Sequence, residues 1–244
     1  MTAAAKGQNI TACIHQPDFA PWLGFFERLA RSDVFVVLDH VQYVRRGWHN
    51  RDRIEVGGRE AWLSVPVISI GKYDQAIGAT EINNAMDWRR KHLATLKGNY
   101  SQAAFFSQYI DALTSIYSVE HSNLADFNMA LIMWAFSLME INVELSFSSS
   151  LQLAGNKDDM LINCCEKLGA TRYVTGTGAR AYLQEPLFTK HGIEVVWQNW
   201  QEPVYDRGAG PKRHGLSFLD ALFHTGPKIK DIIRPSWDQQ HGGR

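Results

Sequence analysis

The chain has 244 residues, of which 45% are hydrophobic and 20% charged, enough apolar material for one large α/β domain. Basic and acidic residues both number 25, so the formal net charge is zero, and nucleic acid is not expected as a partner. No apolar run approaches the roughly 20 residues of a membrane span, and the polar N-terminus has no signal-peptide core, so we expect a cytoplasmic protein.

The N-terminal part of the chain has the pattern of a β-α-β unit. Residues 1–9 are predicted to be a flexible tail, and Ile10–Ile14 to be a first strand. An amphipathic helix then starts near Pro21, with Asp18 placed to cap it. Val34–Leu38 is a continuous apolar run, which is typical of a buried parallel strand.

The middle of the chain combines a hairpin with a helical segment. Arg53–Val56 and Glu60–Val67 flank Gly57-Gly58, a pattern that predicts a β-hairpin. A loop with short strand pieces is expected over residues 68–84. A helical insertion is expected over about residues 85–140, with helices at Ala85–Tyr100, Ser107–Ser118 and Ser122–Glu140.

Strands and helices alternate again in the last third. The predicted elements are a strand Glu144–Ser148, a helix Lys157–Leu168 closed by Gly169, a strand Tyr173–Thr175, a helix-like Ala179–Leu183, a strand Ile193–Gln198 and a helix Leu216–Phe223. Residues 234–244 are predicted to be a second flexible tail. The sequence therefore predicts a single α/β domain over residues 10–233, with a Rossmann-like, mostly parallel sheet.

Polar side chains follow the first two predicted strands. His15 and Gln16 end the first strand, and Asp39 follows the second. Parallel strands end at one edge of a sheet, where open α/β sheets bind ligands. We predict His15 as a catalytic base oriented by Asp39, with Gln16 binding substrate. The alternative is that His15 satisfies a backbone group and Asp39 caps a turn.

A cationic and aromatic stretch comes next. Arginine forks bind carboxylate or phosphate, and a tryptophan can stack on a ring. The substrate-binding residues predicted here are Gln42, Arg46, Trp48, Asn50 and Arg51. The alternative is a solvated basic loop with Trp48 in the core. Arginines interleaved with aromatics also suit RNA bases, although the run is short.

A glycine-rich turn lies near the predicted strand Tyr173–Thr175. Gly176 and Gly178 would let backbone N–H groups approach an anion, although ordinary turns also contain this spacing. Trp22 and Tyr182 complete the predicted substrate-binding set. The histidines, acids and three cysteines show no metal-ligand spacing, so no metal site is predicted. Nothing in the sequence sets a cofactor or an oligomeric state.

Five blocks of the chain carry a resemblance to a known family. They are IHQPDFAPWLGFF, SDVFVVLDHVQY with GWHNRDRI, LGATRYVTGTGARAYL, GIEVVWQNW followed by PVY, and LSFLDALFHTGP. In these blocks, which span nearly the whole chain, the sequence resembles the WbqC-like family of bacterial proteins. The resemblance implies a setting in O-antigen and other surface-polysaccharide biosynthesis. The chain departs from the family pattern at His49, where a glutamine is expected, and at Asp52, where an asparagine is expected.

A second likeness concerns the opening of the chain. A strand, a histidine, a proline, a helix with an early glycine and then Ser-Asp-Val-Phe-Val-Val resemble nucleotidylyltransferases of the HIGH superfamily, which implies a HUP-type layout. In those enzymes two histidines at the helix entry hold phosphate. His15 matches the first, but the second would fall near Gly24 or Phe25, where the chain has no histidine.

Together these observations predict a transferase that modifies a small anionic substrate, an amino-sugar or nucleotide-sugar precursor in surface-polysaccharide biosynthesis. The sugar setting is what the family resemblance implies, while the catalytic roles come from the placement of the residues. The alternatives are a nucleotidylyltransferase-like enzyme and a non-catalytic binding or scaffold protein.

Overall fold

The computed structural model describes residues 9–207 and 213–234, and within them the chain forms two compact units. The first unit contains the segment ending at Gln16, Glu27–His40 and Asn142–Trp200. The second contains Pro17–Phe26, Val41–Ile141 and the segment from Gln201 onward. The two predicted tails fall almost entirely outside the described residues.

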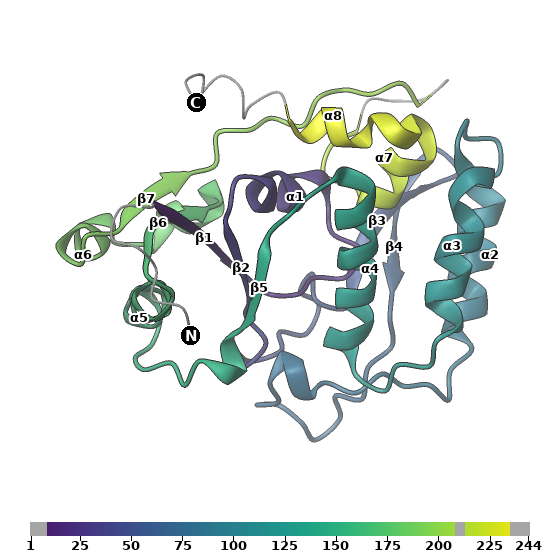
Figure 1. Ribbon diagram of the computed structural model, residues 1–244. Coiled ribbons are helices and arrows are strands. Elements are labelled where there is room, and N and C mark those ends of the chain that lie inside the picture. Colours follow the sequence, from purple (N-terminus) through teal and green to yellow (C-terminus); the bar gives the residue numbers. More distant parts are fainter. Residues whose placement is uncertain (1–8, 208–212, 235–244) are drawn as a thin grey trace. The chain divides into compact units, whose positions relative to one another are not determined.

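Unit 1 is built on a five-stranded parallel sheet with the order β5-β2-β1-β6-β7 (Figure 1). Its strands are β1 (Ile10–His15), β2 (Val34–Val37), β5 (Glu144–Phe147), β6 (Ala170–Thr175) and β7 (Glu194–Trp197). Counted within the unit alone, this order is 3-2-1-4-5, the pattern of Rossmann-like sheets. The chain reverses direction across the sheet between β1 and β6.

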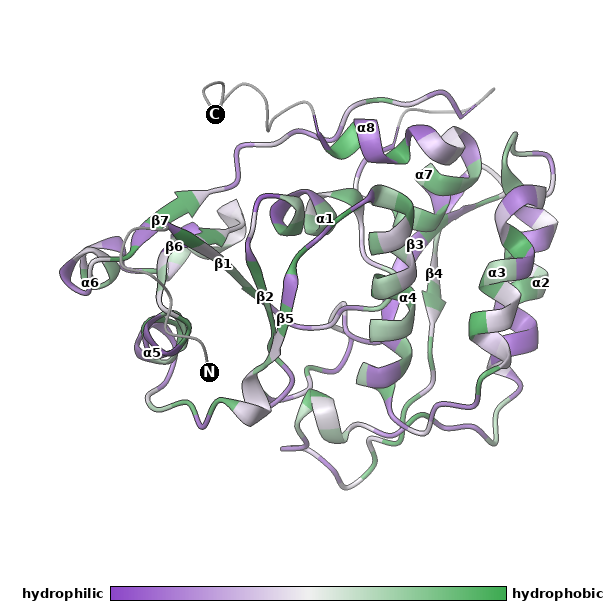
Figure 2. Cartoon of the chain, in the orientation of Figure 1, coloured by the Kyte–Doolittle hydropathy of each residue, from purple (hydrophilic) through white to green (hydrophobic). Residues whose placement is uncertain are grey.

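Apolar strand sequences explain why this sheet forms. Strand β2 is buried along its whole length, and Figure 2 shows β1 and β2 as strongly hydrophobic. Both faces of such a strand are covered, as expected of parallel sheets. Helix α5 (Asp158–Leu168) contacts β6, and α6 (Glu185–Lys190) contacts β7. Between β6 and α6 lies a 3-10 helix, η3 (Thr177–Ala181).

Unit 2 contains a β-hairpin of β3 (Arg51–Val56) and β4 (Arg59–Ser64). Its turn residues have φ values of 56° at Gly57 and 77° at Gly58, which is the type I′ geometry that glycine favours. This two-residue turn fixes the pairing, so Arg51 lies opposite Ser64 and Arg53 opposite Trp62.

The described part of unit 2 also contains five α-helices that belong wholly to it. They are α2 (Trp88–Tyr100), α3 (Phe106–Ser118), α4 (Leu124–Met139), α7 (Phe218–Thr225) and α8 (Ile229–Ile233). Asn123 caps α4 by accepting a hydrogen bond from the backbone N–H of Ala125 at 2.7 Å. An aromatic cluster surrounds Phe127, whose ring centroid lies 5.1 Å from both Trp88 and Tyr117.

Short helices and turns complete the list of elements. Helix α1 (Leu23–Ala30) contributes its first half to unit 2 and its second half to unit 1. The remaining 3-10 helices are η1 (Ile77–Ala79), η2 (Ser148–Ser150) and η4 (Gly226–Lys228).

The predicted α/β class and Rossmann-like parallel sheet are confirmed, and most predicted elements are present within a few residues. Two α-helices were not predicted: the six-residue α6, and α8, which follows Pro227. The helix-like segment at Ala179–Leu183 is the 3-10 helix η3 instead. The HUP-type layout and the single-domain organisation stay predictions.

Two glycines on helices allow a matched stability test. Gly169 ends α5 in the left-handed region at φ 66°, whereas Gly98 lies inside α2, and an added methyl group meets no atom at either site. Gly169→Ala should therefore destabilise by about 1 kcal/mol and Gly98→Ala should stabilise by roughly 0.5 kcal/mol. Urea unfolding followed by circular dichroism measures the free energy of unfolding of both variants. Changes of the same sign in the two variants would contradict the assigned backbone conformations.

Candidate functional site

The carboxyl edge of the unit 1 sheet gathers several of the predicted residues. β1 pairs with β6 in a register that matches Cys13 with Val174, and continuing this register brings His15 level with Gly176. β1 also pairs with β2, matching His15 with Val37, two residues before Asp39. His15 and Gly176 thus end the two strands between which the chain reverses, the position where Rossmann-like sheets bind ligands.

His15 is half-buried, and its ring is hydrogen-bonded to the backbone of the next residue. Its Nδ1 lies 3.0 Å from the carbonyl oxygen of Gln16. A carbonyl only accepts hydrogen bonds, so Nδ1 is the donor in this contact. In the neutral form of the ring, Nε2 is then the nitrogen without a proton, as general-base catalysis requires.

Asp39 anchors the neighbouring strand end through serines. Its carboxylate accepts hydrogen bonds from Ser148 Oγ (2.8 Å) and from Ser149 N (2.9 Å) and Oγ (2.6 Å). Since the single hydroxyl proton of Ser148 goes to Asp39, the contact of 2.6 Å between Ser148 Oγ and His40 Nδ1 is donated by the histidine. The proposed role of Asp39 in orienting His15 stays a prediction.

A buried polar network supports the same edge from α1. Arg28 Nη1 donates to Gln198 Oε1 at 2.7 Å, and Gln198 Nε2 donates to Glu27 Oε2 at 2.6 Å. A methyl group added at Gly176 would lie 3.1 Å from Arg28 Nη1, so this glycine keeps the strand end close to the guanidinium. Burial raises the pKa of the nearby Cys13 thiol to about 11, although Arg28 acts to lower it, so Cys13 is not a ready nucleophile.

Unit 2 contains a basic cavity of about 530 Å³. We call it the arginine pocket; its lining residues are Tyr43, Arg45, Arg46, Asn50, Arg51, Ser64, Val67 and Ser69. Three residues predicted to bind substrate, Arg46, Asn50 and Arg51, therefore line one cavity. Burial raises the pKa of the Tyr43 hydroxyl, although the guanidinium groups of Arg45 and Arg51 act in the opposite direction.

The polar groups of the arginine pocket are incompletely satisfied. Within residues 9–207 and 213–234, no carboxylate forms an ion pair with Arg45, Arg46 or Arg51. The buried Nε of Arg51 and the buried Oδ1 of Asn50 have no hydrogen-bond partner there either. Arg46 also has φ 62°, a conformation that costs a non-glycine residue about 1 kcal/mol. Unpaired cations and a strained arginine are features that a bound anion would explain.

The remaining predicted residues of this stretch lie beside the pocket. Trp48 contacts Trp62 with ring centroids 5.4 Å apart, and the Arg51 guanidinium lies 4.0 Å from the Trp62 ring centroid. Trp48 is exposed, which removes the alternative that it belongs to the core. Gln42 Nε2 donates to the carbonyl of Tyr73 at 2.9 Å, joining the two loops that border the pocket.

Buried contacts behind the pocket fix its loop. His49 Nδ1 lies 3.0 Å from Asp18 Oδ1, and Asn128 Nδ2 donates to the carbonyl oxygens of His49 and Pro17, both at 2.7 Å. Asp18, which we placed as a helix cap, is thus bonded to His49, one of the two residues that depart from the family pattern. Sequence reasoning missed this pair because its members are separated by 31 positions.

Two other cavities lie in unit 2. Trp22, a predicted site residue, lines one of about 450 Å³ with Glu202 and His214. Burial raises the pKa of the Glu202 carboxyl, although the N–H of Gly215 acts to lower it. A larger cavity of about 630 Å³ is bordered by Tyr100 and other residues of a network around Asp220.

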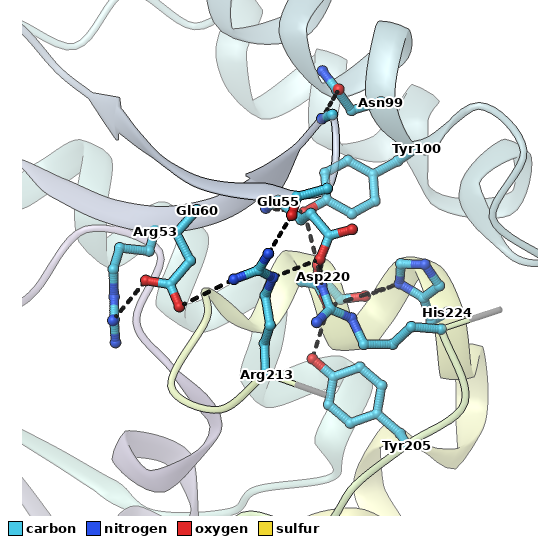
Figure 3. Close-up of polar contacts among 12 residues, drawn as sticks. Arg53, Glu55, Glu60, Asn99, Tyr100, Tyr205, Arg213, Asp220 and His224 are labelled. Carbon is cyan, nitrogen blue, oxygen red and sulfur yellow. Dashed lines mark hydrogen bonds and ion pairs between the residues drawn. The ribbon is translucent and has the colours of Figure 1, made fainter. Parts of the chain in front are cut away.

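The Asp220 network joins distant parts of unit 2 (Figure 3). The fully buried Asp220 carboxylate accepts from Tyr100 and Tyr205, both at 2.8 Å, and from Arg207 at 2.7 Å. Arg207 also contacts Glu55 at 3.0 Å. Because each charge here already has an opposite partner, we interpret this network as structural.

The structure separates the predicted site residues into two groups. His15, Gln16, Asp39, Gly176, Gly178 and Tyr182 belong to unit 1; Trp22, Gln42, Arg46, Trp48, Asn50 and Arg51 belong to unit 2. Tyr182 is exposed and follows η3. Each group is therefore described within its own unit.

Across the described ranges, His, Cys, Asp and Glu side chains form no cluster of three that could hold a metal ion. No helix in this part of the chain has the length and apolar character needed to cross a bilayer.

These features define an α/β protein with a Rossmann-like sheet and an arginine-lined pocket. The chain belongs to the WbqC-like protein family, whose model matches residues 16–232. It is similar to a Mycobacterium tuberculosis protein named "Uncharacterized protein Rv1507c", with 36% identity over 223 residues, covering 91% of this chain and 96% of the relative. No solved structure matches the sequence. The family resemblance noted from the sequence is therefore confirmed.

The hydrogen bonds to Asp39 should make stability depend on pH. Partial burial acts to raise the pKa of the carboxyl, but the bonds from Ser149 and Ser148 outweigh it and hold the pKa below its usual value. Their stabilisation is present above the ordinary aspartate pKa of about 3.9 and is lost as the pH falls through the lower folded value. Asp39→Asn should therefore lower the free energy of unfolding by on the order of 1 kcal/mol at neutral pH, allowing for solvent screening. The decrease should become progressively smaller in acid.

Urea unfolding of both proteins at a series of pH values measures this difference. Asp111→Asn, at an exposed position on α3, is the control and should show no such trend. A cost of Asp39→Asn that grows as the pH falls would contradict the assigned hydrogen bonds.

Proposed function

We propose that this protein is a transferase that binds a small anionic substrate in the arginine pocket. The observation that carries the proposal is the set of three arginines without carboxylate partners around a cavity of about 530 Å³. Guanidinium groups bind phosphate and carboxylate, and a bound anion would neutralise them. The substrate proposed is an amino-sugar or nucleotide-sugar precursor of bacterial surface polysaccharide, by analogy with the setting of the family.

His15 is proposed as the general base. An acceptor amine or hydroxyl would lose its proton to His15 Nε2 while attacking the donor's electrophilic carbon. With an acyl thioester as donor, the new bond forms to the acyl carbon, the carbon–sulfur bond breaks, and the thiolate leaves and is protonated. Positioning of the reactants and the arginine charges would then supply most of the rate. Three free, buried cysteines support the proposed cytoplasmic location.

A second candidate function is nucleotidyl transfer. The unit 1 strand order and the position of His15 at the reversal point favour it, because nucleotides bind there in related sheets. The absence of a histidine at Gly24 and Phe25 counts against it.

Thermal-shift measurements separate these functions. The probes are inorganic pyrophosphate, a nucleotide sugar, an acyl thioester of coenzyme A and a nucleoside triphosphate. Stabilisation by the nucleotide sugar or thioester supports the transferase, whereas stabilisation by the triphosphate alone supports nucleotidyl transfer. A chain that responds to none of them would be better explained as a scaffold.

Arg46→Gly tests the pocket itself. The change removes one cation and relieves the positive φ, so the melting temperature without ligand should stay within about 3 °C of the parent value. Affinity for the stabilising anion should fall about tenfold or more, because a hydrogen bond to a charged group is lost. Arg59→Gln, at an exposed position on β4, is the matched control and should keep full affinity. Equal binding by Arg46→Gly and the parent protein would remove Arg46 from the site.

His15→Ala tests the catalytic role. With a nucleotide amino sugar and an acyl thioester, product detected by mass spectrometry should fall at least about 100-fold, since general-base catalysis contributes that much. His191→Ala removes an exposed imidazole from the same unit and should retain turnover. The circular dichroism spectrum should not change in either variant. Retained turnover in His15→Ala takes this histidine out of the mechanism.

A further inference from the structure

Exposed apolar side chains are concentrated around the arginine pocket. Val44, Trp48, Trp62, Ile68, Ile70 and Tyr73 are all large, hydrophobic and solvent-exposed. Ile70 is 92% exposed and Tyr73 71% exposed, while Trp48 and Trp62 are 46% and 47% exposed. Isolated apolar residues on a surface are ordinary, but a cluster of this kind marks an interaction site.

Backbone contacts place the segments that carry several of these side chains next to the pocket. The loops carrying Val44 and Tyr73 are joined by a hydrogen bond of 2.9 Å from Tyr43 N to Gln75 O and by a bridge between Gln42 and Ala76. Ile68 and Ile70 are the sequence neighbours of Val67 and Ser69, which line the pocket. We call these six exposed residues the apolar rim.

The charge beside the apolar rim is positive. Residues 41–51 contain Arg45, Arg46 and Arg51 and no acidic residue. In residues 66–76, Lys72 and Asp74 offset one another, and Lys72 also pairs with Glu81 at 2.7 Å. An aliphatic and aromatic rim around unpaired arginines matches the outer layer of an anionic bilayer, where apolar side chains reach the acyl boundary and cations meet phosphates.

We propose that this face of unit 2 docks on an anionic membrane surface, with the apolar rim inserted at the interface and the arginines on lipid phosphates. Docking uses the same arginines as the proposed substrate pocket but also requires the rim, which a soluble anion does not. The two proposals can therefore fail separately.

Vesicle co-sedimentation of the full chain tests the docking. The vesicles are pure phosphatidylcholine, or phosphatidylcholine with about one third phosphatidylglycerol. Binding should be at least about tenfold stronger to the anionic vesicles and should weaken in high salt. The double variant Ile70→Ser with Tyr73→Ser should lose about tenfold in vesicle binding, yet bind pyrophosphate as the parent protein does. Arg45→Gln should weaken vesicle binding about fivefold.

Val119→Ser, which replaces another exposed apolar residue at the end of α3, is the matched control and should bind vesicles normally. Equal binding to both vesicle types, no vesicle binding, or full binding by the rim double variant would overturn the proposal. So would rim-dependent binding of single-stranded RNA in place of vesicles. If the parent protein does not bind pyrophosphate, that result would count against the substrate pocket alone.

Discussion

Parallel pairing of β1 with β2 on one side and with β6 on the other is the constraint on which unit 1 depends. It fixes where every strand ends, and so it determines which polar side chains share the carboxyl edge. His15 and Gly176 become neighbours because of this register, although 160 residues of chain separate them. The buried Arg28–Gln198–Glu27 network then holds α1 against the same strand ends.

The arginine pocket of unit 2 depends on a different constraint, a two-residue turn. The type I′ turn sets the hairpin register, and the register puts Arg51 beside Ser64 and Arg53 beside Trp62. The loop that carries Arg46 is then held from behind by the buried contacts of His49 and Asn128. These contacts fix the backbone of the loop, and such support would lower the entropic cost of binding the proposed anion.

Local signals in the sequence predicted much of this fold. The first strand, helix and strand, and the Gly57-Gly58 hairpin, rest on periodicity and turn chemistry within a few residues. The two-residue turn also implies the hairpin register, so the sequence alone could have predicted that Arg51 pairs with Ser64 and Arg53 with Trp62.

Other features of the fold depend on contacts between residues that are distant in the sequence, and no local sequence pattern predicts such contacts. The bond between Asp18 and His49 is one, and the return of the chain from Gln201 onward to the unit that contains residues 41–141 is another. The positive φ of Arg46 could not be predicted either, because arginine rarely adopts it.

The long segment between β2 and β5 has a consequence for synthesis on the ribosome. β2 pairs Val34 with Glu144, and β1 finds β6 only after Ala170 has emerged. The apolar strands β1 and β2 therefore each keep one edge without its hydrogen-bonding partner strand until most of the polypeptide has been made. We expect nascent chains to need chaperone protection during this interval, and sheet completion to be slow because its contacts are so distant in sequence.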